Sequence, residues 1–208
     1  SSSEEVTQRM ASAFRVDPAK IIETGYPRMD RILAPNDEQL NLINLRQEWS
    51  KFGKIILYAP THRKEGHGGA NLFDTLDFQV FNEFLYNNNV AMLIKMHYHH
   101  ESKNNYLLNK FFSNIISLEE GDVPDINNLL PFVDVLISDY SGVLLDYLIL
   151  DRPIIPTPFD LEEYTKYDRE LYEDYDKTVM GINCNNWCEV QIQLQDIFSG
   201  NDLSALCR

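Results

Sequence analysis

Short apolar runs alternate along the chain with longer stretches in which apolar residues recur every three or four positions. The first pattern is typical of strands buried on both faces, and the second of amphipathic helices. We predict strands at residues 54–59, 90–95, 114–117, 133–138 and 153–155, and a less apolar one at 178–182. We predict helices at residues 37–52, 74–87, 102–112, 125–132, 141–150 and 186–198. This alternation predicts an α/β fold, a Rossmann-like and mostly parallel sheet with helices on both faces.

The first 30 residues precede this alternation and differ from it. Residues 5–14 have helical periodicity, and residues 21–30 predict a short extended piece followed by a turn. We therefore expect residues 1–30 to be a helix and linker that lead out of a separate N-terminal half. Residues 31–208 are expected to form one Rossmann-like domain.

Composition and charge narrow the classes of partner. The chain has 208 residues, and 44% of them are apolar, enough for the core of one domain. Its 18 Lys and Arg against 32 Asp and Glu give a net charge of −14. Such a surface disfavours nucleic acid and anionic membranes, so an anionic ligand needs a local cluster of positive groups. The chain contains no run of about 18 apolar residues, which is the length needed to span a bilayer. The three cysteines, an odd number, predict free thiols in a reducing cytoplasm.

Polar residues gather after three of the predicted strands. In a sheet of this kind, ligands bind beyond the carboxyl ends of the strands, where the strand order reverses. If the order is 3-2-1-4-5-6, strands one and four are neighbours at that point and strand two lies beside strand one. The clusters are Thr61, His62 and Arg63 after strand one, Lys95 and His97 after strand two, and Ser138, Asp139, Tyr140, Ser141 and Gly142 after strand four.

These residue types suit the binding of phosphate. Arg63 can grip two phosphate oxygens at once, and Lys95 supplies a point charge. His97 can donate to a diphosphate or protonate a leaving phosphate. A helix that begins at Ser141 and Gly142 offers unpaired backbone N–H groups to an anion. The sequence therefore predicts a phosphate site at this edge of the sheet.

Several of these residues also have purely structural interpretations. Arg63 and Lys95 could pair with surface carboxylates, and Asp139 could cap the following helix. Asp146, one turn into that helix, could accept hydrogen bonds from ribose hydroxyls. The acidic, tyrosine-rich residues 159–175 are expected to form a solvated helix or loop, with a lid or a wall on the acceptor side as the alternative.

The closely spaced histidines His97, His99 and His100 raise the question of a metal site. Contiguous histidines on one loop rarely reach one ion without a carboxylate or cysteine. We therefore predict no metal site and no cofactor.

Seven motifs in sequence order carry a family resemblance. They are Gly25-Tyr26-Pro27-Arg28-Met29-Asp30, Tyr58-Ala59-Pro60-Thr61-His62-Arg63, Lys95-Met96-His97, Ser138-Asp139-Tyr140-Ser141, Asp146-Tyr147, Asp151-Arg152-Pro153-Ile154-Ile155 and Asp160-Leu161-Glu162-Glu163-Tyr164. In this order and spacing, from about residue 25 to 175, the chain resembles the CDP-glycerol glycerophosphotransferase family, the polyol-phosphate transferases of teichoic-acid and capsule polymers.

The resemblance implies a GT-B enzyme with two Rossmann-like halves, of which this chain is the C-terminal, donor-binding half. It implies transfer of a polyol phosphate, with glycerol phosphate as the leading candidate, from a CDP-linked donor to a hydroxyl of a cell-surface polymer or lipid-linked acceptor. CMP is released. The expected location is the cytoplasm, at the inner face of the cell membrane, with membrane association through parts outside this chain. The base is expected to be a histidine of the other half, so this chain alone would bind donor without turning it over.

The resemblance also implies roles for individual residues. His97 and Arg63 resemble the catalytic contacts to the diphosphate and the leaving group. The residues that resemble donor and phosphate contacts are Arg28, Thr61, Arg63, Lys95, His97, Asp139, Tyr140, Ser141 and Gly142. Asp146 resembles the acidic residue that GT-B folds place on a ribose.

Two departures from the family pattern keep other functions open. Tyr98 stands where the family often has proline, and Gly142 where it often has a second serine. The first change removes a rigid turn, and the second removes a hydroxyl near the phosphates. One alternative is a sugar-nucleotide glycosyltransferase or epimerase on the same GT-B scaffold, which donor preference would separate. The other is a non-catalytic nucleotide-binding module, which binding without turnover in the full-length protein would support.

Overall fold

The chain folds around one parallel sheet whose strand order follows the predicted one. The computed structural model describes residues 1–34, 47–63, 75–96, 108–119, 121–179 and 181–200. The strands are β1 (Lys54–Tyr58), β2 (Val90–Ile94), β3 (Ile115–Ser117), β4 (Val135–Ser138) and β5 (Ile154–Pro156). They pair in the order β3-β2-β1-β4-β5, and every pairing is parallel. The first five predicted strands and their order are therefore confirmed.

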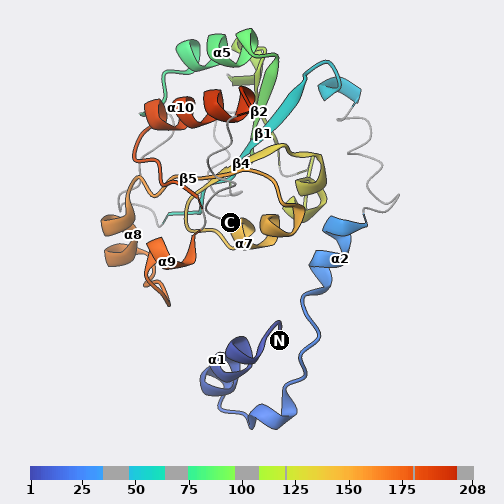
Figure 1. Cartoon of the computed structure of the whole chain (residues 1–208), viewed down its shortest axis with the longest axis vertical. Helices are drawn as coiled ribbons and strands as arrows, with labels where there is room; N and C mark the ends of the chain where they lie inside the picture. Colours follow the sequence, from blue (N-terminus) through green and yellow to red (C-terminus); the bar gives the residue numbers. More distant parts are fainter. Residues whose placement is uncertain (35–46, 64–74, 97–107, 120, 180, 201–208) are drawn as a thin grey trace.

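Helices connect these strands and cover both faces of the sheet (Figure 1). The α-helices are α1 (Glu4–Phe14), α2 (Pro27–Leu33), α5 (Phe78–Asn87), α7 (Val143–Tyr147), α8 (Leu161–Tyr167), α9 (Tyr175–Thr178) and α10 (Trp187–Phe198). The short 3-10 helices are η1 (Pro18–Lys20), η4 (Ile126–Asn128), η5 (Leu130–Phe132) and η6 (Leu148–Leu150). Asp77 and Asn186 cap α5 and α10 with side-chain oxygens that accept from backbone N–H groups of the first turn.

Alternation along the strands divides the core into two layers. Ile56 of β1 points into a layer with Phe81 of α5 and Leu194 of α10. Its neighbour Leu57 points into the opposite layer, which includes Tyr147 of α7. Successive side chains of a strand lie on opposite faces, so a wholly apolar strand needs helices on both. The predicted fold class, Rossmann-like with helices on both faces, is confirmed.

The predicted sixth strand, residues 178–182, is wrong. Thr178 ends α9, and the described residues that follow it form no strand. Gly181 has a φ of +120°, which a regular strand does not contain. Just beyond it, the Cys184 N–H donates to the Pro156 carbonyl of β5 at 2.9 Å, and the described residues from 179 to 184 are not assigned to the sheet.

The helix predicted at residues 125–132 is replaced by the two 3-10 turns η4 and η5. Pro131 has no N–H to donate and would interrupt an α-helix at this position. The helices predicted at 37–52 and 102–112 lie largely outside the described residues. Within the described part, residues 47–49 and 108–111 are helical.

The N-terminal segment extends away from the sheet. In Figure 1, α1 lies apart from the strands, and residues 15–26 lead back from it to α2. Ile32 of α2 is buried in the core layer that contains α7, so α2 packs as part of the Rossmann-like body. In the part of the chain that the structure describes, no helix is long and apolar enough to cross a membrane.

Candidate functional site

The carboxyl ends of β1, β4 and β5 bring three loops together. Because β1 pairs with β4 and β4 with β5, the segments that follow these strands leave the sheet side by side. The Ser138 hydroxyl, at the end of β4, donates to the Ala59 carbonyl beyond β1 at 2.5 Å. The Thr157 hydroxyl, beyond β5, donates to the Ser138 carbonyl at 3.1 Å. The predicted meeting of the first and fourth strands is therefore present.

Asp139 fastens the loop after β1 to the loop after β4. One carboxylate oxygen accepts from the Thr61 N–H at 2.8 Å, the Thr61 hydroxyl at 2.6 Å and the Tyr140 N–H at 2.6 Å. The other accepts from Arg63 at 2.8 Å. Asp139 is buried and does not cap α7, because the residue at the N-cap position of that helix is Gly142.

Arg63 links the same carboxylate to the loop after β5. Its Nε and Nη2 donate to the two oxygens of Asp160 at 2.7 and 2.8 Å, in the bidentate geometry that fits a carboxylate. Its Nη2 also donates to Asp139, and its Nη1 donates to the Thr61 carbonyl at 2.6 Å. The Arg63 side chain is only 15% exposed. Arg63 thus makes ion pairs with two carboxylates, one from each neighbouring loop.

Two tyrosines enclose this ion-pair cluster. The Arg63 guanidinium lies 5.0 Å from the ring centroid of Tyr140 and 4.8 Å from that of Tyr164. The two rings stack at 4.1 Å, and the Tyr140 hydroxyl donates to Asp160 at 2.9 Å. The Tyr175 hydroxyl donates to the Asp139 carbonyl at 2.9 Å. Aromatic faces and hydrogen bonds together hold the cluster in one arrangement.

The charge state of the cluster follows from this pairing. Burial alone would lower the pKa of Arg63, but the hydrogen bonds that Arg63 donates to Asp160 and Asp139 and the charges of these carboxylates outweigh it, so the pKa is raised. Burial alone would raise the pKa of Asp160. The hydrogen bonds that Asp160 accepts from Arg63 and Tyr140 outweigh this effect, so its pKa is lowered. Burial, followed by the Asp160 charge, raises the pKa of the Tyr140 hydroxyl. Arg63 and Asp160 are therefore both charged at neutral pH.

Asp160, Tyr164 and Tyr175 lie in the tyrosine-rich residues 159–175, and the sequence alone predicts no individual role for them. The expectation that residues 159–175 are solvated is wrong for these three, which are buried, whereas Tyr172 is exposed. Four tyrosines among carboxylates in one short segment were the available clue to a packed wall.

Ser141 and Gly142 lie where the loop after β4 turns into α7. The Ser141 hydroxyl oxygen accepts from the Val143 N–H at 3.3 Å. Gly142 is exposed, its φ is −58°, and a Cβ built there would meet no atom within 4 Å. The space in front of this helix start is therefore open.

Arg28 and Asp146, predicted as separate donor contacts, contact each other. Arg28 of α2 donates from Nε and Nη2 to the two Asp146 oxygens at 2.7 and 3.0 Å. Asp146 is buried, and the hydrogen bond to it raises the pKa of Arg28. The Arg28 guanidinium also lies 4.3 Å from the Tyr26 ring centroid. This pair fixes α2 against α7.

Of the cations predicted after β2, the structure describes Lys95. It is half-buried, its backbone N–H donates to the Tyr58 carbonyl at 3.0 Å, and its side chain has no ion-pair partner among the described residues. His97, His99 and His100 lie outside the described residues. The predicted roles of His97 thus stay predictions.

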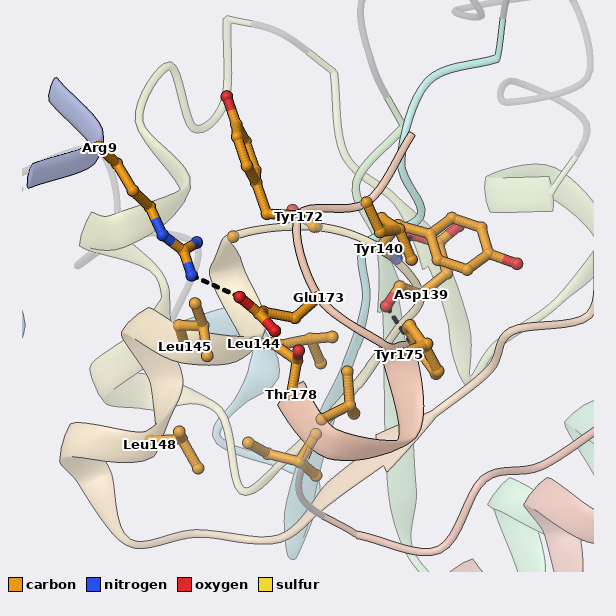
Figure 2. A pocket seen from close by; sticks show the side chains of 15 residues that line it. Arg9, Asp139, Tyr140, Leu144, Leu145, Leu148, Tyr172, Glu173, Tyr175 and Thr178 are labelled. Atoms are coloured by element: carbon orange, nitrogen blue, oxygen red, sulfur yellow. Dashed lines mark hydrogen bonds and ion pairs between the residues drawn. The ribbon is translucent and has the colours of Figure 1, made fainter. Parts of the chain in front are cut away.

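A cavity of about 230 Å³ adjoins the start of α7 (Figure 2). Its walls are mostly apolar side chains of α7 and of residues 171–179. Arg9 of α1 reaches the mouth of this cavity, where it pairs with Glu173 at 2.7 Å and lies 5.4 Å from the Tyr172 ring centroid. Ser141 and Gly142 are among the residues that line it.

The structure is thus a Rossmann-like α/β domain with a polar, partly charged cluster at the carboxyl edge of its parallel sheet. The sequence model of the family "CDP-Glycerol:Poly(glycerophosphate) glycerophosphotransferase" matches residues 1–205. The chain belongs to this family, as its motifs indicated.

Individual relatives agree with this assignment. The chain is 33% identical over 183 residues to the teichoic acid glycerol-phosphate transferase of Staphylococcus aureus (strain NCTC 8325 / PS 47), covering 84% of this chain and 44% of the relative. It is 32% identical over 178 residues to the teichoic acid ribitol-phosphate polymerase TarL of the same strain, covering 82% of this chain and 30% of TarL. The chain thus spans less than half the length of these relatives.

Solved structures agree as well. A variant of the wall teichoic acid polymerase TagF superposes with a TM-score of 0.72 at 27% identity, covering 99% of this chain and 50% of TagF. The same variant soaked with CDPG gives a TM-score of 0.70 with the same coverage. The structure of MnaA of S. aureus with UDP, at 16% identity and a TM-score of 0.59, shares the fold.

Asp160→Asn tests the ion-pair cluster. The variant loses the charge of the carboxylate that Arg63 grips in a bidentate contact, while Arg63 keeps its ion pair with Asp139, so the free energy of unfolding at pH 7 is expected to fall by about 2 kcal/mol. The pKa of Asp160 is lower in the folded than in the unfolded chain. The ionised carboxylate therefore contributes fully to the free energy of unfolding above about pH 4, and this contribution is lost as the pH falls through the pKa of the folded state. Urea unfolding at pH 7 and pH 3 should show a gap between wild type and variant that shrinks in acid.

The matched control is Glu163→Gln on the exposed face of α8, expected to change stability by less than about 0.5 kcal/mol. A gap between wild type and Asp160→Asn that stays the same at both pH values would contradict the pairing.

Proposed function

We propose that this chain is the donor-binding half of a polyol-phosphate transferase. It binds a CDP-linked polyol, with CDP-glycerol as the leading candidate. The whole enzyme moves the polyol phosphate to a hydroxyl of a cell-surface polymer or lipid-linked acceptor. The observation that carries the proposal is the family match over residues 1–205. The names of the glycerol-phosphate and ribitol-phosphate relatives, and the TagF variant soaked with CDPG, support a CDP-linked donor.

We place the donor phosphates at the edge formed by the loops after β1, β2 and β4. The open space around Gly142 supports this placement, because the backbone of an exposed glycine lets a ligand approach closely. Lys95 supports it too, as a cation beside that edge without an ion-pair partner among the described residues. In a chain of net charge −14, such a group matters more than it would in a neutral protein.

The reaction is a substitution at the β-phosphorus of the donor. The acceptor hydroxyl oxygen forms a bond to this phosphorus, and the bond from the phosphorus to the oxygen that bridges to CMP breaks. CMP leaves with the electron pair of that bond, and the hydroxyl proton passes to a base, which we place on a histidine of the other half. Such chemistry needs positioning and charge neutralisation more than a covalent intermediate. We assign His97 to donate a proton to the bridging oxygen.

The proposed setting is the cytoplasmic face of the cell membrane. The names of the relatives refer to teichoic acid, and that of TagF to wall teichoic acid, which supports a place where such a polymer is assembled. In this proposal, membrane association of the full-length protein uses parts outside this chain.

Lys95→Ala tests the donor site. Loss of one charge-assisted hydrogen bond to a phosphate costs about 2 kcal/mol, so the Kd for CDP-glycerol should rise roughly thirtyfold. Calorimetric titration with CDP-glycerol, CDP-ribitol, CMP and UDP-GlcNAc measures both affinity and preference. The control is Lys54→Ala, at the opposite end of β1, which should leave the Kd unchanged. A wild type that prefers UDP-GlcNAc, or a Lys95→Ala variant with wild-type affinity, would contradict the proposal.

Gly142→Ser tests whether the helix start faces the phosphates. The helical φ of Gly142 and the open space around it accommodate serine without strain. Its hydroxyl adds one hydrogen-bond donor, so the Kd for CDP-glycerol should fall roughly threefold to tenfold. Gly142→Ala is the control for backbone effects and should give no such gain. Equal affinities for the serine and alanine variants would show that no phosphate lies within reach.

A further inference from the structure

The amino ends of three neighbouring strands border a cavity at the edge of the sheet opposite the proposed donor site. Strands β1, β2 and β3 pair in parallel, so the segments that precede them meet at one edge. The cavity has a volume of about 550 Å³ and is lined from residues 51–52, 86–89 and 113–114. We call it the amino-edge cavity. The five residues of β1, about 17 Å, separate it from the donor edge, so one small ligand cannot occupy both.

Backbone and buried side-chain bonds hold the three segments around this cavity in place. The Gly53 N–H donates to the Asn89 carbonyl at 2.7 Å, which joins the segment before β1 to the segment before β2. Asn114, before β3, is only 3% exposed, and its side-chain amide donates to the Val90 carbonyl at 2.7 Å. Its backbone N–H donates to the Asn82 side chain of α5 at 3.0 Å. The cavity is therefore built on a fixed frame.

Several polar groups that line the cavity are left uncommitted. Four exposed side chains have no hydrogen-bond or ion-pair partner among the described residues, those of Lys51, Tyr86, Asn87 and Asn89. Asn88, between the two asparagines, instead donates to the Phe84 carbonyl at 2.9 Å. A Cβ at Gly53 would lie 3.1 Å from the amide nitrogen of Asn89, so glycine leaves room for that amide. The Lys51 ammonium lies 4.9 Å from the ring centroid of Phe52, which also lines the cavity.

These uncommitted groups suit a ligand that carries hydroxyls and a negative charge. A side-chain amide both donates and accepts, as a hydroxyl does, so Asn87 and Asn89 can bond polyol hydroxyls in either direction. Tyr86 offers an apolar ring to carbon and a hydroxyl at its tip. The Lys51 ammonium binds phosphate as a point charge. None of the described residues that line the cavity is acidic, although the chain carries a net charge of −14, so the cavity spares an anion the repulsion of the surface as a whole.

Other classes of ligand fit this cavity less well. The described residues that line it include no carboxylate, histidine or cysteine, the side chains that most often bind metal ions. One lysine is too little charge for nucleic acid, whose binding depends on many phosphate contacts. A wholly apolar ligand would bury the two amides without partners, which costs free energy.

We propose that the amino-edge cavity binds polyol phosphate, with Asn87 and Asn89 on its hydroxyls and Lys51 on its phosphate. This is a second site, separate from the donor edge, and the cavity's own groups assign its ligand. Two sources share this chemistry: a free polyol phosphate, and one unit of a polyol-phosphate polymer. Only the second source rests on the proposed function. Pockets for ligands larger than a single small polyol have volumes of about 300–1,000 Å³, so the cavity has room for either.

NMR titration of the ¹⁵N-labelled chain tests the site with glycerol 3-phosphate, ribitol 5-phosphate and an oligomer of glycerol phosphate. We expect shifts in the backbone amides of residues 51–53 and 86–89 and in the side-chain amides of Asn87 and Asn89. Glycerol and inorganic phosphate should each bind about tenfold more weakly, because each lacks half of the contacts. An oligomer that binds more tightly than glycerol 3-phosphate identifies the polymer as the source, and equal affinity identifies the free polyol phosphate.

Lys51→Gln and Asn89→Asp should each raise the Kd for glycerol 3-phosphate roughly tenfold. The first removes the charge that pairs with phosphate, and the second places a carboxylate where an amide donates. Asn89 has a φ of +56°, which aspartate also tolerates, so the second variant keeps the backbone. The matched control is Lys54→Gln, which removes the same charge at the exposed start of β1, outside the residues that line the cavity. It should leave the Kd unchanged.

An absence of shifts at residues 51–53 and 86–89 would overturn the proposal. So would inorganic phosphate or glycerol that binds as tightly as glycerol 3-phosphate. Equal losses in Lys51→Gln and Lys54→Gln would reveal attraction to the general charge of this edge, which would overturn it too. A parallel titration with CDP-glycerol separates the two proposals. If the wild type binds no CDP compound, the proposed function fails, while the response of residues 51–53 and 86–89 to glycerol 3-phosphate still decides this site.

Discussion

The buried ion pairs of Arg63 with Asp139 and Asp160 are the interaction on which the carboxyl edge of the sheet depends. Strands β1, β4 and β5 end beside one another, and the described residues of the loops that follow them form no further strand. A buried charge must be paired to persist, so one guanidinium held by two carboxylates requires all three loops to meet in one arrangement. The aromatic rings of Tyr140 and Tyr164 limit the access of water to this cluster and strengthen its hydrogen bonds.

This arrangement divides the edge into a structural part and a binding part. The ion pairs of Arg63 with Asp139 and Asp160 form the structural part, and we propose Gly142 and Lys95 for the binding part. A second ion pair, between Arg28 and Asp146, fixes α2 against α7. Arg28 and Arg63 thus both form ion pairs with carboxylates of the protein itself.

The fold could be predicted from sequence because buried parallel strands must be apolar throughout, and five such runs are separated by helical periodicity. The failures have local causes: Pro131 divides a helix into two 3-10 turns, and the positive φ of Gly181 accompanies a segment that forms no strand. The site was harder to predict, because an arginine fork fits phosphate and carboxylate equally well. Only the fold shows that Asp160, 97 residues from Arg63, is its partner. The seven ordered motifs correctly indicated the family, and the predicted role of His97 stays a prediction.

The central claim is that a CDP-linked polyol binds at the edge formed by the loops after β1, β2 and β4. An NMR titration of the ¹⁵N-labelled chain with CDP-glycerol, followed through backbone amide shifts, tests it most directly. The account predicts that the largest shifts fall on Thr61, Lys95, Ser141 and Gly142, and that UDP-GlcNAc produces smaller ones at the same concentration. Shifts confined to the cavity beside Tyr172, equal shifts with UDP-GlcNAc, or no shifts at all would contradict it.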